Sequence, residues 1–117
     1  MFTSINPATG EPGRSFAELT DAQVEARLAK AHDTFLAWRE SSLDDRMTLL
    51  RHIAERFEDD KDRLARIATE EMGKTLKSAV AEVEKCASAF RYYARHGAQL
   101  LKAAEVDTPV GHAVARW

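Results

Sequence analysis

Four segments of the chain carry apolar residues at alternating steps of three and four, which is the spacing of one face of an α-helix. The four stripes are Val24, Leu28, Ala31, Phe35 and Trp38; Met47, Leu50, Ala54 and Phe57; Leu64, Ile67, Ala68 and Met72; and Leu76, Val80, Val83, Ala87, Phe90 and Ala94. Residues 20–105 are therefore predicted to be helical. Alanine supplies 20 of the hydrophobic residues that make up 44% of the 117-residue chain, so the predicted core is thin.

Capping signals define the predicted helix ends. Thr20 and Gln23 form a capping box before the first stripe, and Ser42 has the place of an N-cap before the second. Only a few residues separate these two helices, so they are predicted to be antiparallel neighbours. Gly73 is predicted to end the third helix in a left-handed conformation, and Gly97 to end the fourth and longest one.

Both ends of the chain have strand character. Residues 1–19 contain the turn-forming stretch "PATGEPG" and predict a short hairpin or a pair of edge strands. Residues 106–117 predict the start of a strand that has Ala113, Ala115 and Trp117 on one face and no partner after it. The fold class is thus mainly α, with an N-terminal β-hairpin and a C-terminal strand start.

Cys86 is the only cysteine and the first candidate nucleophile. It lies in mid-helix, about three turns from the positive end of the helix dipole, so the dipole does little to favour its thiolate. Lys85 points about 100° away, because adjacent residues on a helix do not share a face. We interpret Cys86 as a small buried hydrophobic residue, and we assign no catalytic residue.

The remaining polar residues also lack the spacing of a site. Four histidines lie in different elements without the i, i+4 spacing of a helical metal site: His32, His52, His96 and His112. Two carboxylate pairs, Glu70 with Glu71 and Glu82 with Glu84, are explained by solvation or by helix pairing such as Glu82 with Lys85. The acidic stretch 58–62 is interpreted as a solvated turn. No glycine-rich phosphate loop follows a predicted strand, so no cofactor or metal residue is assigned.

The charge pattern argues against two classes of partner. The net charge is −2, and acidic and basic residues alternate along the chain, which gives no field that would concentrate nucleic acid or anionic lipid. No apolar stretch approaches the ~20 residues of a membrane span. With one unpaired cysteine there is no internal disulfide framework, and we expect a cytoplasmic protein.

Three stretches together resemble the opening region of the NAD(P)-dependent aldehyde dehydrogenase family, most closely its members that oxidise succinate semialdehyde. They are "INPATGEP", "AHDTFLAWRESSLDDRMTLLRHIAERF" and "EEMGKTLKSAVAEVEKCASAFRYYA", in that order. Thr75 stands where proline commonly follows "EMGK", and Ala81 stands where glycine is often found. The resemblance covers the whole chain, residues 1–117, as a single N-terminal segment.

The resemblance implies a larger α/β Rossmann-like fold in which residues 20–105 form a helical layer on the cofactor-binding domain and residues 106–117 begin an oligomerisation strand. It implies NAD or NADP as cofactor and a cysteine thiolate that attacks the aldehyde before hydride transfer and hydrolysis. The family's nucleophile, its base and its nucleotide loop match no residue here. Two hypotheses follow: an N-terminal segment of a homo-oligomeric enzyme, inactive alone, or a stand-alone helical interaction or decoy module that binds a full-length relative.

Overall fold

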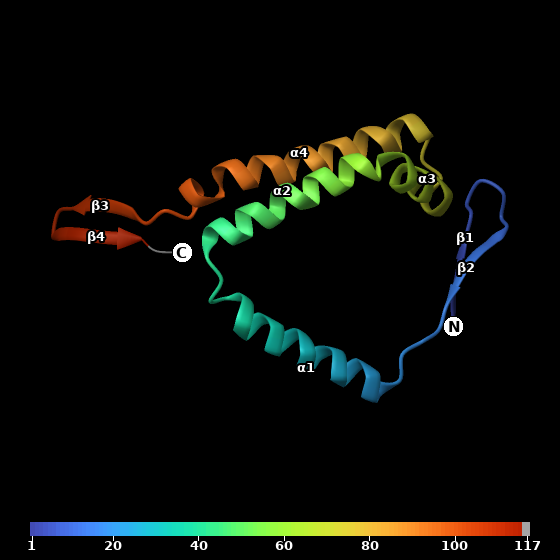
Figure 1. Cartoon of the computed structure of the whole chain (residues 1–117), viewed down its shortest axis with the longest axis horizontal. Helices are drawn as coiled ribbons and strands as arrows, with labels where there is room; N and C mark the ends of the chain where they lie inside the picture. The colour runs from blue at the N-terminus through green and yellow to red at the C-terminus, as the bar shows by residue number, and fades with distance from the viewer. Residues whose placement is uncertain (116–117) are drawn as a thin grey trace.

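The computed structural model describes residues 1–115, which form four helices and two separate hairpins (Figure 1). The elements follow the order β1 (Phe2–Ile5), β2 (Pro12–Phe16), α1 (Asp21–Trp38), α2 (Leu43–Asp59), α3 (Lys61–Met72), α4 (Leu76–Leu100), β3 (Ala104–Thr108) and β4 (Gly111–Ala115). The predicted class, mainly helical with a hairpin at the N-terminus, is confirmed.

The packed part of the molecule consists of α2, α3 and α4. Figure 1 shows α2 and α4 side by side along most of their length, with α3 against the N-terminal half of α4. The buried side chains are small, namely Ala54, Ala65, Ala79, Val83 and Ala87. The rings of Phe57 and Phe90 pack beside them with centroids 5.4 Å apart. The thin alanine-rich core predicted from the composition is thus confirmed within this helical unit.

Gly97 does not end α4 as predicted, because the helix continues to Leu100. The residue is buried against α2 instead, and a Cβ atom built on it would lie 2.7 Å from Met47 Sδ. Glycine here allows the two helix axes to approach closely. Gly73, in contrast, has φ +69° and ends α3 as predicted.

The acidic stretch 58–62 was predicted to be a solvated turn, but most of it belongs to helices α2 and α3. Only Asp60 separates α2 from α3, and it serves as the C-cap of one helix and the N-cap of the next. Two members of the stretch also join helices: Lys61 Nζ lies 2.9 Å from Glu84 Oε1, and Arg91 Nε donates to Glu58 Oε1 at 2.9 Å. A charged stretch at a helix junction can thus be used for ion pairs between helices.

The prediction that α1 and α2 are antiparallel neighbours was also wrong. Within residues 1–115, α1 has no buried residue and shares no extended packing interface with another element (Figure 1). The reason is competition for one surface, since the apolar stripe of α2 already packs on α4. The capping box of Thr20 and Gln23 and the N-cap of Ser42 are confirmed. Local signals therefore placed the helices correctly but not their packing.

The N-terminal hairpin pairs β1 with β2 antiparallel, with Phe2 opposite Phe16 and an irregularity between Thr3 and Ile5. Its turn is closed by Asn6, whose carbonyl oxygen accepts the Gly10 N–H at 2.8 Å and whose Oδ1 accepts the Ala8 N–H at 2.9 Å. Asparagine is favoured in such turns because its side chain accepts a hydrogen bond from the backbone two residues later.

The C-terminal strand has a partner, so the predicted unpaired strand was wrong. β3 and β4 pair antiparallel from Ala104 opposite Ala115 to Thr108 opposite Gly111, and Pro109 and Val110 form the turn between them. The segment that was predicted to begin one strand thus contains the end of β3, the turn and β4. The expectation for Trp117 falls outside the described residues.

The chain is extended rather than compact. Its radius of gyration is 20.6 Å, against about 13 Å for a compact domain of this length. Its accessible surface is 9650 Å², whereas a compact protein of 13.1 kDa exposes about 6,400 Å². Roughly a third of the surface is therefore in excess of what a compact chain of this mass would expose.

Candidate functional site

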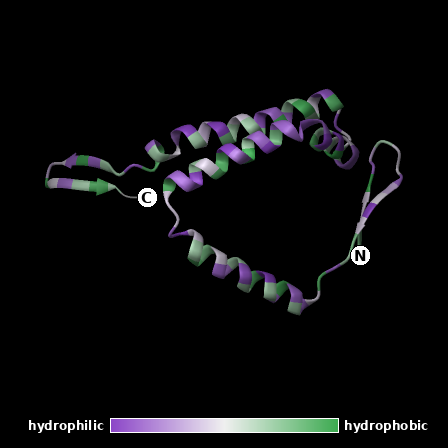
Figure 2. Cartoon of the chain, viewed as in Figure 1, coloured by the Kyte–Doolittle hydropathy of each residue, from purple (hydrophilic) through white to green (hydrophobic). Residues whose placement is uncertain are grey.

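The most extensive surface feature of the described chain is its exposed apolar side chains. The α1 stripe, defined as Val24, Leu28, Ala31, Phe35 and Trp38, is solvent-exposed along its whole length, with 60% of Leu28 and 56% of Phe35 accessible. Figure 2 shows hydrophobic positions recurring along α1 although no other element lies against it. Exposed apolar surface on this scale is typical of an interaction site.

Other large apolar side chains extend this surface to the remaining elements. Those with at least half of their surface accessible are Met1, Phe2, Ile5, Met72, Tyr92, Tyr93, Leu100, Leu101, Val110 and Val114. They lie on both hairpins, at the end of α3, and in and just after the C-terminal half of α4. The uncovered surface therefore follows the whole chain and is not one local patch.

Cys86 lies on α4 at the edge of an open depression. The depression is lined by Lys74, Ser78, Ala81, Glu82, Lys85, Cys86 and Ala89. Cys86 is partly accessible, so the interpretation as a small buried residue was wrong. The predicted pairing of Glu82 with Lys85 is replaced by an ion pair between Glu82 and Lys74 at the N-terminal end of α4. The place of Cys86 in the middle of α4, about three turns from the N-terminal end of the helix, remains a position for packing.

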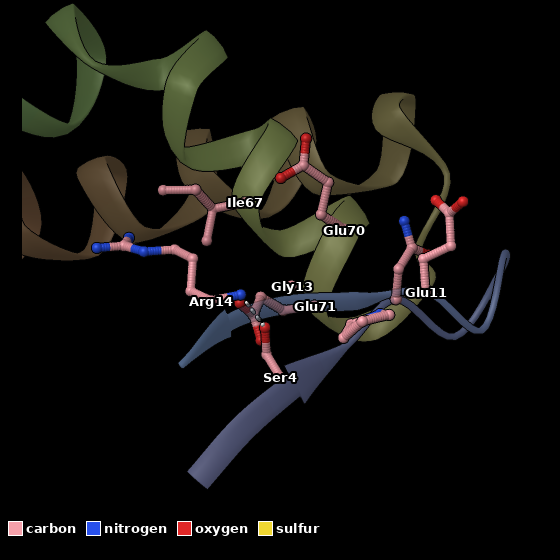
Figure 3. Close-up of a pocket in the computed structure, with 9 residues that line it drawn as sticks. Ser4, Glu11, Gly13, Arg14, Ile67, Glu70 and Glu71 are labelled. Carbon is pink, nitrogen blue, oxygen red and sulfur yellow. Dashed lines mark hydrogen bonds between the residues drawn. The ribbon is translucent and has the colours of Figure 1, made fainter. Parts of the chain in front are cut away.

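A second depression, of about 190 Å³, lies between the N-terminal hairpin and α3 (Figure 3). Its walls are Ser4, Asn6, Glu11, Pro12, Gly13, Arg14, Ile67, Glu70 and Glu71. The Glu70 carboxylate turns away from the hairpin strands in Figure 3, and adjacent helix positions diverge. Glu70 and Glu71 thus share a wall of this depression without being aimed at one point within it.

The histidines are as dispersed as predicted. His32 lies in α1, His52 in α2, His96 in α4 and His112 in β4. His112 Nδ1 is 2.6 Å from Asp107 Oδ1 across the C-terminal hairpin, at an exposed position. Across residues 1–115, no group of three or more histidine, cysteine, aspartate or glutamate side chains is arranged to hold a metal ion.

The described residues do not fit a dinucleotide. Such a cofactor is usually bound where a strand leads through a glycine-rich turn into a helix. Here β2 leads into α1 through residues 17–20, which contain no glycine, and the only strand pairings described are two antiparallel hairpins.

Among the described residues 1–115, no helix is long and apolar enough to cross a membrane.

Arg46 is a structural residue that helical spacing did not predict. It lies in the first turns of α2, and its guanidinium reaches back to the end of α1. The ion pairs that join α4 to α2 and α3, made by Arg91 and Glu84, were not predicted either. Both residues lie off the apolar stripe of α4, and periodicity alone does not say which neighbouring helix such a polar flank will meet.

Comparison with known proteins identifies the class. The family model described as "Aldehyde dehydrogenase family" matches residues 1–115, and the chain belongs to that family. The resemblance inferred from the sequence is confirmed.

Individual relatives narrow the comparison. The chain is 46% identical over 99 residues to a succinate-semialdehyde dehydrogenase [NADP(+)] of Mycobacterium avium, covering 84% of this chain and 21% of that protein. It is 33% identical over 112 residues to the enzyme of the same name from Deinococcus radiodurans, covering 96% and 24%. The crystal structure of succinic semialdehyde dehydrogenase from Streptococcus pyogenes with NADP+ superposes with a TM-score of 0.90 at 31% identity, covering 99% and 26%.

These relatives are much longer than the present chain. It spans about a fifth to a quarter of their length. The superposition nevertheless includes the open arrangement of α1 and the two hairpins, because almost the whole chain is matched.

Proposed function

We propose that the chain acts as the N-terminal segment of an NAD(P)-dependent aldehyde dehydrogenase and is catalytically inert alone. Its helices would cover the cofactor-binding domain, and β3 and β4 would contribute to the sheet through which the enzyme forms a homo-oligomer. Succinate semialdehyde and NADP are the first substrate and cofactor to test, because the relatives above carry these names. A cytoplasmic location suits the free thiol of Cys86.

The observation that carries this proposal is α1, an amphipathic helix without a single buried residue. Helices in water are stabilised mostly by packing of the apolar face, and α1 has no such packing within residues 1–115. Since about three quarters of these relatives' length lies outside the matched part, the covering surface would come from that remainder.

The segment's role in catalysis would be indirect. When NAD(P) is bound to a complete enzyme it supplies the hydride acceptor, and no residue of this chain is assigned to hold it. What these residues contribute is a layer that excludes water from the domain beneath it and strands that add to a sheet.

A second function is that of a stand-alone module that binds a full-length relative. The intact mass of the protein in its native source separates the two. A mass several times 13.1 kDa supports the segment of a longer enzyme. A mass of about 13.1 kDa supports the module and directs the search to a partner that covers the α1 stripe.

The behaviour of the isolated 117 residues gives an independent test. If the apolar stripes need a covering surface, the chain will bind an environment-sensitive dye and associate as its concentration rises. Cooperative unfolding of a clean monomer without dye binding would contradict the proposal. Sedimentation and fluorescence measure both properties on the same sample.

Replacement of the only cysteine tests its assignment. Cys86→Ser in the longer native enzyme should leave acylation by the aldehyde intact and change only packing stability, because the thiol lies in mid-helix, about three turns from the N-terminal end of α4. Rapid-mixing measurement of the acylation step, with circular dichroism as the folding control, gives the answer. Loss of acylation in a folded Cys86→Ser enzyme would assign a catalytic role to this thiol.

A further inference from the structure

The position of α1 relative to α2 is fixed by a small polar junction. Residues 39–42 connect the two helices, and no extended side-chain packing holds α1 elsewhere within the described chain. A helix attached only through a four-residue link is free to swing unless the link itself is ordered. The contacts that order it are therefore the ones that decide how α1 is presented.

Arg46 makes most of those contacts. Its Nη2 donates to the carbonyl oxygens of Trp38 at 3.0 Å and Arg39 at 2.8 Å, and its Nε donates to Ser41 Oγ at 2.9 Å. The side chain is partly buried, and its Cζ lies 5.9 Å from the centroid of the Trp38 ring. One guanidinium thus contacts the last turn of α1, its C-cap and the link.

The acceptors are groups that need a donor. The last carbonyl groups of a helix have no partner within the helix, and they form the negative end of its dipole. The last turn of α1 contains no basic residue of its own. Arg46 supplies positive charge and N–H donors to that end from α2, and Ser41 Oγ donates to the Trp38 carbonyl at 2.6 Å beside it.

The other end of the junction is ordered from the α2 side. Ser42 Oγ accepts the Asp45 N–H at 3.0 Å, which caps α2 and fixes the helical turn that carries Arg46. The guanidinium therefore projects from a rigid base onto the end of α1. Its planar fork makes several hydrogen bonds in one orientation, which a lysine ammonium on a flexible stem does not reproduce.

We propose that Arg46 is a latch that fixes the angle between α1 and α2 and so holds the exposed α1 stripe in one direction. Without the latch, α1 remains a helix but swings about residues 39–42. With the latch, the α1 stripe is preorganised for the surface that covers it, and less conformational entropy is lost on docking. This last consequence rests on the proposed function, whereas the latch itself is a property of the 117-residue chain.

Pulsed electron paramagnetic resonance on spin-labelled chain tests the latch. Lys30→Cys on α1 and Glu55→Cys on α2 are exposed labelling sites, used in a Cys86→Ser background. Excess unlabelled chain removes distances between molecules. We expect a narrow distance distribution that broadens about twofold in Arg46→Gln, because only the flexible link then restrains α1. Arg46→Lys should give an intermediate width.

Arg51→Gln is the matched control, because Arg51 lies on the same helix and donates to Thr48 Oγ1 without reaching α1. It should leave the distribution unchanged. A second label pair, Glu55→Cys with Ser88→Cys on α4, reports whether α2 and α4 remain packed. An Arg46→Gln distribution as narrow as that of the unchanged chain, with α2 and α4 packed, would overturn the proposal.

If Arg46→Gln also broadens the α2–α4 distance, the Arg46→Lys variant tests the latch in its place, since lysine keeps the positive charge and the aliphatic stem. Broadening confined to the α1–α2 distance supports the latch, and no broadening contradicts it. This readout is independent of the intact-mass measurement. If Arg46→Gln broadens the α1–α2 distance and the native protein has a mass of 13.1 kDa, the latch is supported. The proposal of an N-terminal segment of a longer enzyme is then rejected.

Discussion

The packed helices α2, α3 and α4 and the unpacked helix α1 have similar sequence patterns but opposite environments. Each has an apolar stripe at helical spacing, and α1 has large side chains in its stripe, including Phe35 and Trp38. Yet the buried residues lie in α2, α3 and α4, and α1 contributes none. An amphipathic pattern therefore indicates that a face will be covered, but not that the same stretch of chain provides the cover.

Charged residues show the same division. Arg91 with Glu58 and Lys61 with Glu84 join different helices of the packed unit. The polar contacts of α1 are local, at its capping box and at its junction with α2. Long-range ion pairs thus accompany the packing that is complete within the described chain.

The largest expected effect comes from introducing a charge into the packed unit. Val83→Asp places a carboxylate where only 8% of the valine is exposed, between α4 and its neighbours. We expect a loss of about 3 kcal/mol or more from the local stability of α4, since a buried carboxylate lacks a partner there. Amide hydrogen exchange of α2 and α4 measures this loss.

Val24→Asp makes the same chemical change on α1, where 41% of the valine is exposed. Its effect on exchange in α2 and α4 should be below about 0.5 kcal/mol, and it should reduce dye binding and association by interrupting the α1 stripe. Equal destabilisation by the two substitutions would mean that α1 packs in solution and that the comparison fails.

A smaller effect is expected where the N-terminal hairpin meets the packed unit. Gly73→Ala forces a left-handed residue, φ +69°, to carry a Cβ atom that would lie 3.0 Å from Pro7 Cγ. The backbone strain costs about 1–2 kcal/mol, and the hairpin turn is also displaced. Exchange of the last-turn amides of α3 and of the hairpin amides reports both.

Gly10→Ala separates the effect of the Pro7 contact from the effect of backbone strain. Gly10 has φ +75° with open space around its Cβ position. It should therefore show only the strain, and α3 should be unaffected. If Gly73→Ala leaves hairpin exchange unchanged, Pro7 does not restrain the hairpin.

The smallest expected effect is a pH dependence confined to the packed unit. The hydrogen bond and charge of Arg91 lower the pKa of Glu58 below its ordinary value of 4.5. A carboxyl group with a lowered pKa in the folded state stabilises that state above its unfolded pKa, and this stabilisation is lost as pH falls through the folded pKa. Helicity measured by circular dichroism between about pH 7 and 3 should fall less in Glu58→Gln than in the unchanged chain.

Glu25→Gln, on α1, is the control and should leave the acid transition unchanged. Because the Glu58 and Arg91 side chains are both partly solvent-exposed, added salt should also weaken the difference between Glu58→Gln and the unchanged chain. An acid transition that is identical in Glu58→Gln and the unchanged chain would show that this pair does not stabilise the helices.

Sequence reasoning succeeded where the determinant is local. The Thr20 capping box, the Ser42 cap and the Gly73 terminus depend on neighbouring residues, and all are present. It failed where the determinant is another element. Gly97 was taken as a helix end because its burial against Met47 is a contact between residues 50 positions apart. The pairing of β3 with β4 was missed because residues 106–117 were assigned to one strand and not to parts of two strands with a turn at Pro109 and Val110.

The candidate site was predictable only in part. The family was recognised from three short stretches and is confirmed over residues 1–115. The partial exposure of Cys86 and the latch at Arg46 depend on side-chain surroundings that helical spacing does not specify. Spacing gives a residue's direction around its helix, whereas its function here depends on what lies in that direction.

The alanine-rich interface between α2, α3 and α4 has a calorimetric consequence. The change in heat capacity on unfolding follows the apolar area that becomes exposed, and here the buried side chains are four alanines and one valine. The packed unit should therefore melt with a small heat-capacity change and a broad, shallow stability curve. Most of the heat-capacity change of a complete enzyme in this region would then come from covering the outer faces of these helices, above all that of α1.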